Sequence, residues 1–271
     1  MSRREPLAIS STSNPRLKGA VALRERKERE RSGHILVEGL REVRRALDAG
    51  LVAVEVWTET GDGGQENDEL TRRCGEAGAQ VISAAPHVFE KLAMREGGSG
   101  IVSIFEKPEV DVQATFANRS GRAPLVLALW GVEKPGNLGA LLRTADGAGV
   151  SSVIVLEGGV DVYAPQTIRA SLGTVFTQPV LGMGSDELRV ACHQHGISIV
   201  AAALTDAARL PWEVDLKGPT CILLGSEAHG LPAEWLAVST AMQIPMQGAA
   251  DSLNVAAAGA IALYEAMRQR H

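Results

Sequence analysis

The sequence predicts an α/β protein of two domains, of which the second is larger and is built on a mostly parallel sheet. Its second half contains continuous apolar runs typical of strands buried on both faces, namely Leu125–Trp130, Val153–Leu156, Ile197–Ala203 and Cys221–Gly225. Helical segments separate these runs, which is the alternation expected of a parallel sheet. Aromatic residues make up only 4% of the 271 residues, so aliphatic side chains must fill the interior.

The first hundred residues predict a smaller α/β unit of short elements. Apolar residues recur at helical spacing within 16–31 and 37–48, and the second stripe consists of Val37, Leu40, Val43 and Leu47. Glycine and asparagine in residues 61–68 predict a loop. The other predicted elements are a strand at Leu51–Trp57, a helix near 68–77, a strand at Gln80–Ile82, a helix near 86–95 and a strand at Ile101–Phe105.

A polar stretch with proline near each end, KPEVDVQATFANRSGRAP (107–124), lies between the two halves of the chain. This composition is typical of a linker. We therefore predict a first domain over residues 1–106, a linker over 107–122 and a second domain over 123–271.

Composition argues against several classes of protein. The three cysteines lie far apart without the spacing of a zinc site or a disulfide framework. Cys192 with His193 and His195 could suggest a metal, but a solvated helix end is the favoured interpretation. The first residues contain no apolar stretch, so no secretory signal is expected. The longest apolar run, Val255–Tyr264, is about half a membrane span. These features predict a soluble, cytoplasmic protein with no membrane partner.

The charge of the sequence favours nucleic-acid binding only in residues 1–31. The net charge of −5 is not that of a basic nucleic-acid-binding domain. Residues 1–31, however, hold nine Lys or Arg against four Glu, a local charge of +5 (nine minus four). The cations are Arg3, Arg4, Arg16, Lys18, Arg24, Arg26, Lys27, Arg29 and Arg31. Two interpretations stay open, a patch that contacts phosphates and a solvated helix stabilised by ion pairs.

Three segments of the second half could form a site, and the first is WGVEKPGNLGALLRTADGAGV (130–150). A strand ends at Trp130, Asn137 stands where a helix N-cap is expected, and Arg143 lies on the following helix. A helix N-terminus at the carboxyl end of a parallel strand is the usual place for a ligand. The alternative is a packing helix with a surface arginine, since the glycines do not fit a dinucleotide-binding motif.

The second segment is CILLGSEAHGLP (221–232), in which a buried strand runs into Gly225, Ser226 and Glu227. Glycine allows a ligand to approach the backbone closely, and an acid there can accept hydrogen bonds from hydroxyls. A serine hydrolase using Ser226 and His229 is disfavoured, because the segment lacks the nucleophile-elbow pattern.

The third segment is MQIPMQGAADSLNVAAAGAIALYEAMRQR (242–270). A short strand is predicted to end at Ile244–Pro245–Met246, and a polar turn leads to Ser252, Leu253 and Asn254. A long helix follows, for which Ser252 is the expected N-cap. Its many Ala and Gly residues would allow another helix to approach closely.

Together these segments resemble the three signature motifs of the SpoU (TrmH) family of RNA methyltransferases, in the SPOUT superfamily. Asn137 and Arg143 match the first motif, GSEAHGLP the second and IPMQGAADSLNVAAAGAIALYE the third, within residues 123–271. The stretch VYAPQTIRASLGTVFTQPV (162–180) is also similar to the family and would bring Arg169 and Ser171 near the site. Glu133 stands where the family often has Asp, which keeps a carboxylate.

The front of the chain resembles the substrate-binding domain of the same family, a small fold shared with certain ribosomal proteins. The matching residues are ISSTSNPRLKGAVAL (9–23) and HILVEGLREVRRALDAG (34–50). This resemblance favours the basic segment as an RNA contact.

The resemblance implies a deep trefoil knot, a homodimer packed through the knotted domain, and methyl transfer from S-adenosylmethionine to a ribose 2′-hydroxyl of a structured RNA. The catalytic candidates are Asn137, Arg143, Glu227, Ser252 and Asn254. The candidate cofactor-binding residues are Leu224, Gly225, Ser226, Ile244, Pro245, Met246, Ser252 and Leu253. The candidate RNA contacts are Arg16, Lys18, Arg24, Lys27, Arg143 and Arg169. No metal is expected.

The role of Arg143 and the identity of the RNA stay open. Arg143 could be the general base, but a guanidinium is a very weak acid that resists deprotonation, so phosphate contact or polarisation of the hydroxyl would serve as well. Ribosomal RNA is favoured over transfer RNA because of the N-terminal domain. A non-catalytic RNA-binding assembly factor and a base methyltransferase are the remaining alternatives.

Overall fold

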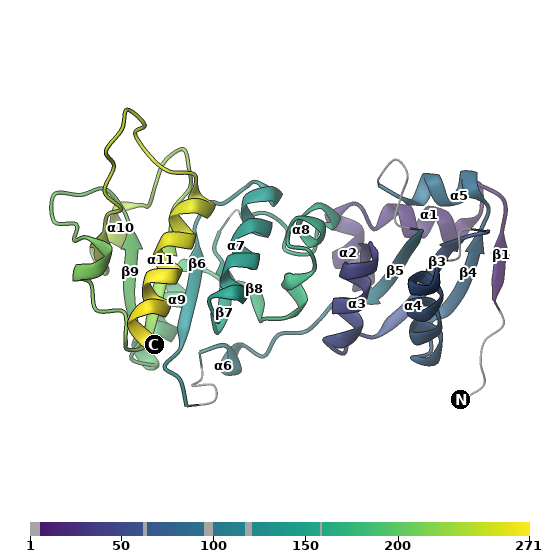
Figure 1. The fold of residues 1–271 in the computed structure, drawn as a ribbon, viewed down its shortest axis with the longest axis horizontal. Helices are drawn as coiled ribbons and strands as arrows, with labels where there is room; N and C mark the ends of the chain where they lie inside the picture. The colour runs from purple at the N-terminus through teal and green to yellow at the C-terminus, as the bar shows by residue number, and fades with distance from the viewer. Residues whose placement is uncertain (1–5, 62–63, 95–99, 117–120, 158) are drawn as a thin grey trace. The chain divides into compact units, whose positions relative to one another are not determined.

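The computed structural model describes residues 6–61, 64–94, 100–116, 121–157 and 159–271. Backbone contacts divide the chain into two compact units (Figure 1). The first unit comprises Met1–Glu109 and Tyr163–Thr177, and the second comprises Val110–Val162 and Gln178–His271. Both units are α/β, as the sequence predicts.

The first unit is built on a mixed five-stranded sheet in the order β1-β4-β3-β5-β2. The strands β1, β4 and β3 run parallel, whereas β5 pairs antiparallel with β3 and β2. The strands are β1 (Leu7–Ile9), β2 (His34–Glu38), β3 (Ala53–Glu59), β4 (Gln80–Ala84) and β5 (Ile101–Glu106). The helices are α1 (Pro15–Ala22), α2 (Arg26–Ser32), α3 (Leu40–Asp48), α4 (Gln65–Glu76), α5 (Pro86–Leu92), α8 (Pro165–Ala170) and the 3₁₀ helix η1 (Thr174–Phe176).

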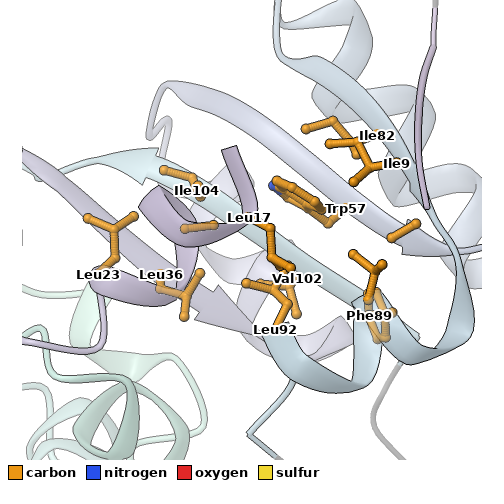
Figure 2. Close-up of a cluster of buried hydrophobic side chains, with 13 residues drawn as sticks. Ile9, Leu17, Leu23, Leu36, Trp57, Ile82, Phe89, Leu92, Val102 and Ile104 are labelled. Carbon is orange, nitrogen blue, oxygen red and sulfur yellow. The ribbon is translucent and has the colours of Figure 1, made fainter. Parts of the chain in front are cut away.

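Helices cover both faces of this sheet. On one face α1 and α5 enclose an apolar cluster around the fully buried Trp57, to which α1 contributes Leu17 and α5 contributes Phe89 and Leu92 (Figure 2). On the other face α4 packs against the sheet, where the Cys74 thiol lies 3.8 Å from the Ser103 hydroxyl. Burial of this kind contributes about 1.5–3 kcal/mol for each large apolar side chain.

The helix predicted over 37–48 is wrong at its start. Residues His34–Glu38 form the strand β2, and Val37 is fully buried in the sheet. Gly39 follows with φ +116°, a conformation that cannot belong to a right-handed helix, so α3 begins only at Leu40. The helix predicted over 16–31 is likewise two helices, α1 and α2, with a break at residues 23–25.

The second unit contains a six-stranded sheet in which every neighbouring pair is parallel, as the apolar runs predict. The strand order is β11-β9-β10-β6-β7-β8. The strands are β6 (Leu125–Leu129), β7 (Ser152–Val155), β8 (Val180–Gly182), β9 (Ser198–Ala202), β10 (Thr220–Leu224) and β11 (Thr240–Met242). The helices are α6 (Val112–Thr115), α7 (Pro135–Gly147), α9 (Ser185–Gln194), α10 (Ala233–Leu236), α11 (Val255–Arg270) and the 3₁₀ helix η2 (Pro211–Glu213).

The helices α7 and α11 lie side by side on one face of this sheet (Figure 1). Gly259 of α11 makes this packing possible, since a β-carbon there would overlap Leu141 of α7 and lie 2.9 Å from Leu224 of β10. The other face packs against α9 and α10 through a cluster that includes Leu188 and the fully buried Trp235.

The strand order reverses between β6 and β10, which are direct neighbours in the sheet. From β6 the chain proceeds outward through β7 to β8, and it then returns to the other side of β6. At the carboxyl ends of the two strands, the Trp130 N–H donates to the Leu224 carbonyl at 2.8 Å. Such a reversal point is where open parallel sheets bind their ligands.

The predicted linker is partly structured. Residues 112–115 form α6, and Phe116 is buried in the apolar cluster of the second unit. The Ser152 hydroxyl donates to the Thr115 carbonyl at 3.1 Å, which fixes this stretch to β7. Residues 117–120 of the predicted linker lie outside the described residues. The contacts also group residues 163–177 with the first unit, so the domain boundaries given above remain predictions.

The described helices include none that combines the length and apolar content needed to cross a lipid bilayer.

The C-terminal end of α11 is fixed by one guanidinium. Arg270 donates to the carbonyls of Leu216 at 2.7 Å, Ala123 at 2.8 Å and Gly218 at 2.6 Å. These carbonyls belong to the segments that precede β6 and β10, so Arg270 joins α11 to the start of both central strands.

Arg270→Ala is therefore expected to lower the free energy of unfolding of the second unit by about 2–4 kcal/mol, because three backbone carbonyls lose a charged donor. Arg268→Ala is the matched control on the same helix, since Arg268 forms only an exposed pair with Glu265 and its loss should cost less than about 1 kcal/mol. Urea unfolding followed by circular dichroism measures both, and equal effects would contradict the assigned role of Arg270.

Candidate active site

A cavity of about 390 Å³ opens at the carboxyl ends of β9, β10 and β11, beside the N-terminus of α11. All of its walls belong to the second unit. The lining residues are Leu236 and residues from the segments 202–204, 224–227, 229–231, 242–246 and 251–258. This is one side of the reversal point between β6 and β10, so the sheet topology itself places the cavity.

The turn after β10 presents backbone to the cavity. The Ser226 N–H donates to the Gly230 carbonyl at 3.2 Å and the Gly230 N–H returns a bond to the Ser226 carbonyl at 3.0 Å. The His229 N–H donates to the Ser226 hydroxyl oxygen at 3.1 Å. A β-carbon at Gly225 would overlap the carbonyl of Gly230 and lie 2.8 Å from the Leu231 nitrogen. Only glycine allows this close backbone contact.

A chain of hydrogen bonds joins α7, α11 and this turn. The Asn137 amide donates to the Glu227 carboxylate, and the Asn254 amide donates to the Asn137 side-chain oxygen at 3.2 Å. The Asn254 side-chain oxygen accepts from the Ala256 N–H at 2.9 Å and so caps α11. The three motifs that lie far apart in the sequence therefore meet through three side chains.

The two expected N-caps need correction. Lys134 is the N-cap of α7, because Pro135 suits the first helical position, and Asn137 lies within the first turn. Asn254 caps α11, whereas Ser252 lies two residues earlier on the cavity wall. Both corrections leave the side chains at the site while changing what they do there.

The cavity collects most of the predicted cofactor residues. Those that line it are Leu224, Gly225, Ser226, Ile244, Met246, Ser252 and Leu253. Pro245 is not one of the lining residues, although both of its neighbours are. Of the catalytic candidates, Glu227 and Ser252 line the cavity. Asn137 is bonded to Glu227, and Asn254 is bonded to Asn137.

Arg143 lies away from the cavity. It is exposed on α7, six residues after Asn137, which is about 9 Å along the helix axis. Among the described residues it has no hydrogen bond or ion pair, so its guanidinium is available to a partner from outside the unit.

The sequence did not single out several cavity residues. These are Ala202, Ala203, Leu204, Leu236, Met242, Gln243 and Asp251. The signal for the first three was present, since they lie at or directly after the end of the predicted strand Ile197–Ala203 and parallel strands end at a common edge. The position of Leu236 depends on tertiary packing that no local pattern encodes.

The charge of the cavity favours a cationic ligand. Two carboxylates, Glu227 and Asp251, line it, whereas its described lining residues include no Lys or Arg. Leu231, Leu236 and Met242 supply an apolar wall. The cavity thus suits a molecule with a positive centre, hydrogen-bonding groups for the exposed backbone, and an apolar or aromatic part.

A further carboxylate at this edge of the sheet, Glu157, has a structural role. Glu157, after β7, accepts the Ser185 N–H at 2.8 Å and the Ser185 hydroxyl at 3.0 Å. These bonds hold the pKa of Glu157 below its usual value and fix the start of α9.

The basic residues of the first unit divide into engaged and available ones. Arg24 donates to the carbonyls of Lys91, Leu92 and Ala93 and so caps α5. Arg16 pairs with Glu55 at 2.7 Å. Lys18 and Lys27 are exposed and have no hydrogen bond or ion pair with the described residues.

Part of the basic segment is a solvated helix with ion pairs, which was one of the two interpretations of its charge. These ion pairs lie within α2. Arg26 pairs with Glu30, and Arg31 pairs with Glu28. The bond between Arg31 and Glu28 lowers the pKa of Glu28 and raises that of Arg31. Arg3 and Arg4 lie outside the described residues.

The stretch 162–180 contributes mainly to the first unit. Arg169 lies half-buried on α8, and the buried Ser171 hydroxyl donates to the Ile168 carbonyl at 2.8 Å. Arg45 of α3 donates to the Leu172 carbonyl at 2.7 Å, which attaches this stretch to the helix.

The residues of the possible metal site are used in packing or at a helix end. Cys192 is buried in the cluster beneath α9, and the His195 ring stacks on Phe116 with 5.7 Å between centroids. In the described part of the chain, no three His, Cys, Asp or Glu residues are grouped as metal ligands.

Two family models match the chain. The SpoU rRNA methylase family matches residues 124–264, and the MRM3-like substrate binding domain matches residues 14–103. An uncharacterised tRNA/rRNA methyltransferase of Synechocystis is 31% identical over 270 residues, which covers 97% of this chain and 94% of the relative. The 23S rRNA (uridine(2479)-2′-O)-methyltransferase of Streptomyces viridochromogenes is 32% identical, over 90% of this chain and 86% of that protein.

Solved structures agree with these matches. An RNA 2′-O ribose methyltransferase superimposes with a TM-score of 0.83 at 39% identity, covering 97% of this chain and 99% of the other. An AdoMet-bound rRNA methyltransferase from Sinorhizobium meliloti gives a TM-score of 0.88 at 29% identity, covering 97% and 98% of the two chains.

The double role of Asn254 can be separated by substitution. Asn254→Ala removes both the cap and the bond to Asn137, and should lower the free energy of unfolding of the second unit by about 1 kcal/mol or more. Asn254→Asp keeps the oxygen that caps α11 but cannot donate to Asn137, so it should stay close to the wild type. Thermal unfolding measures both variants. If Asn254→Asp were as unstable as Asn254→Ala, the cap would not be the main contribution of Asn254 to stability.

Proposed function

The chain belongs to the SpoU rRNA methylase family, and we propose that it transfers a methyl group from S-adenosylmethionine to a ribose 2′-hydroxyl of ribosomal RNA. The observation that carries this proposal is the cavity at the carboxyl ends of the strands, in whose wall Glu227 is bonded to Asn137 and, through it, to Asn254, so that three separate motifs meet. The 2′-O-methyltransferases among the relatives support the reaction, and their ribosomal RNA substrates support the substrate class.

The cavity residues fit S-adenosylmethionine. Glu227 and Asp251 suit its positive charge, and the backbone around Gly225 and Gly230 can approach it without side chains between. Leu231 and Leu236 offer an apolar surface to its adenine ring. When bound, the cofactor supplies a methyl group that is attached to a positively charged sulfur. This sulfur is a good leaving group, because it becomes a neutral thioether when the methyl group is transferred.

The protein then has two tasks, orientation and removal of the hydroxyl proton. Asn137 holds one carboxylate oxygen of Glu227, and the other oxygen accepts no hydrogen bond from the described residues. We assign that free oxygen to the ribose 2′-hydroxyl, whose proton it accepts when the hydroxyl oxygen takes the methyl group. Asn254 orients Asn137, so the two amides fix the direction of the carboxylate without themselves touching the hydroxyl.

Arg143 acts as a cation rather than as the base in this proposal. Its guanidinium binds the phosphate that flanks the reacting ribose. A bidentate contact of this kind holds the sugar in place.

The functional unit is a homodimer packed through the second unit. Ile261 and Tyr264 are 42% and 47% exposed on α11, which leaves an apolar stripe on this helix without cover in one chain. The Tyr264 hydroxyl lies beside Gly147 of α7, one helical turn from Arg143. Pairing through this stripe brings Arg143 into the interface and supplies its guanidinium to a site there.

The fold and the location follow the family. The segments around the cavity form the deep trefoil knot of the SPOUT superfamily, and the protein acts in the cytoplasm. Residues 1–106 bind the RNA, with Lys18 and Lys27 as the available cations of the basic segment.

Transfer of labelled methyl from S-adenosylmethionine to ribosomal RNA and to transfer RNA, in separate reactions, tests the activity. We expect label in ribosomal RNA as a 2′-O-methylnucleoside that blocks alkaline cleavage at one position. Label only in transfer RNA would change the substrate class, and an alkali-sensitive product would indicate base methylation. Cofactor binding without transfer to either RNA would favour the non-catalytic assembly factor.

Arg143→Ala should lower methyl transfer by at least about 100-fold, because the phosphate loses its charged partner. The affinity for S-adenosylmethionine, measured by calorimetry, should change by less than about threefold, since Arg143 lies outside the cavity. Full activity in this variant would exclude the role given to Arg143.

Gly225→Ala should weaken S-adenosylmethionine binding by about tenfold or more, because the new β-carbon forces the turn at Gly230 to move. Gly248→Ala is the matched control, since a β-carbon there meets no atom within 4 Å. Calorimetric titration of both variants measures the effect. Equal affinity in the two would show that the turn does not contact the cofactor.

A further inference from the structure

The segment 203–216, between β9 and β10, is fixed near both ends and is here named the strap. At its start, the Ala203 N–H donates to the Met242 carbonyl at 3.1 Å, and at its centre the Arg209 N–H donates to the Ala241 carbonyl at 3.0 Å. The Gln243 N–H donates to the Arg209 carbonyl at 2.9 Å. Near its end, the Gln269 side chain of α11 bonds the Val214 carbonyl at 3.0 Å and accepts the Leu216 N–H at 2.9 Å. The strap therefore holds its side chains in defined positions.

Trp212 projects from the middle of the strap and is 58% exposed. The other tryptophans differ, since Trp57 and Trp235 are fully buried and Trp130 is half-buried. The Leu210 N–H donates to the Glu213 carboxylate at 2.9 Å, and Pro211 is buried, so the turn that carries the indole is rigid. A large aromatic ring kept in water on a rigid support is typical of a binding surface.

The surroundings of Trp212 favour RNA as its partner. Arg209 is exposed, three residues before Trp212, and its guanidinium has no partner among the described residues. The strap adjoins the cavity at two points. Leu204, at the start of the strap, is 64% exposed and lines the cavity. Gln243 also lines the cavity, and its N–H is bonded to the Arg209 carbonyl. An aromatic face with a nearby guanidinium is the combination that binds an unpaired base and its phosphate.

A second copy of the chain would use another side of α11. Tyr264 faces α7, whereas Gln269 faces the strap. Gln269 lies about 140° around the helix from Tyr264 and about 80° from Ile261. The apolar stripe assigned to the dimer is therefore on a different side from Trp212.

We propose that Trp212 stacks on an unpaired nucleobase of the substrate RNA, near the methylated ribose, and that Arg209 binds a phosphate of the same strand. This inference rests on the proposed function. It specifies the substrate as a loop, bulge or other unpaired region, because a base within a duplex offers no free face for stacking.

Fluorescence and kinetics together test the proposal. Acrylamide quenching of tryptophan emission should be strong in the free protein and should fall when the substrate RNA is added, with Trp212→Phe removing the RNA-sensitive part. Trp212→Ala should raise the KM for RNA about tenfold and Arg209→Ala about threefold, with kcat and S-adenosylmethionine affinity close to wild type. Trp212→Phe should recover most of the affinity. Val190→Ala, a 55% exposed apolar residue of α9, is the control and should change nothing.

Two outcomes would overturn the proposal. An unchanged KM in Trp212→Ala, with active wild type, would show that the indole does not contact the RNA. An indole protected from acrylamide before RNA is added, with a weaker dimer in Trp212→Ala, would assign Trp212 to a second copy of the chain. Quenching does not depend on turnover, so an inactive wild type would count against the proposed function while the RNA contact could still be measured.

Discussion

The backbone of Gly225 lies directly against that of Gly230, and the rest of the site depends on this contact. It closes the turn after β10 tightly enough for Ser226 and Gly230 to exchange two hydrogen bonds. The closed turn sets the position of Glu227, which then accepts the Asn137 amide of α7. Asn137 in turn binds the capping residue of α11. The contact between these two glycines thus helps to position the turn after β10, the helix α7 and the helix α11.

The sheet of the second unit could be predicted because its strands are continuous apolar runs. Elements that depend on one residue were harder to predict. Val37 belongs to a helical stripe in the sequence, yet the positive φ of Gly39 ends any helix there and leaves Val37 in a strand. The side chains of the site were predicted from motifs, but their bonds were not. The helix α7 begins at Pro135, before Asn137, and the cap of α11 is Asn254 and not the predicted Ser252.

The net charge of −5 does not show that acidic and basic side chains gather in different parts of the chain. In the cavity the charges are carboxylates, which suit a cationic cofactor. The first unit carries basic side chains, and the structure separates them into two groups. Arg24 serves the fold by capping α5, whereas Lys18 and Lys27 remain exposed. Counting cations in the sequence cannot make this distinction, because it depends on which carbonyls lie within reach.

The attachment of residues 163–177 to the first unit has a consequence for synthesis on the ribosome. Arg45 can bind the Leu172 carbonyl, and Gly173 can pack against α3, only after these residues have left the exit tunnel. By then β6, α7 and β7 have already been made. A domain at the start of a chain usually folds first, before the rest of the chain is made. The first unit cannot complete its folding in this way, because it also contains residues 163–177. Its last contacts form while the second sheet is already assembling.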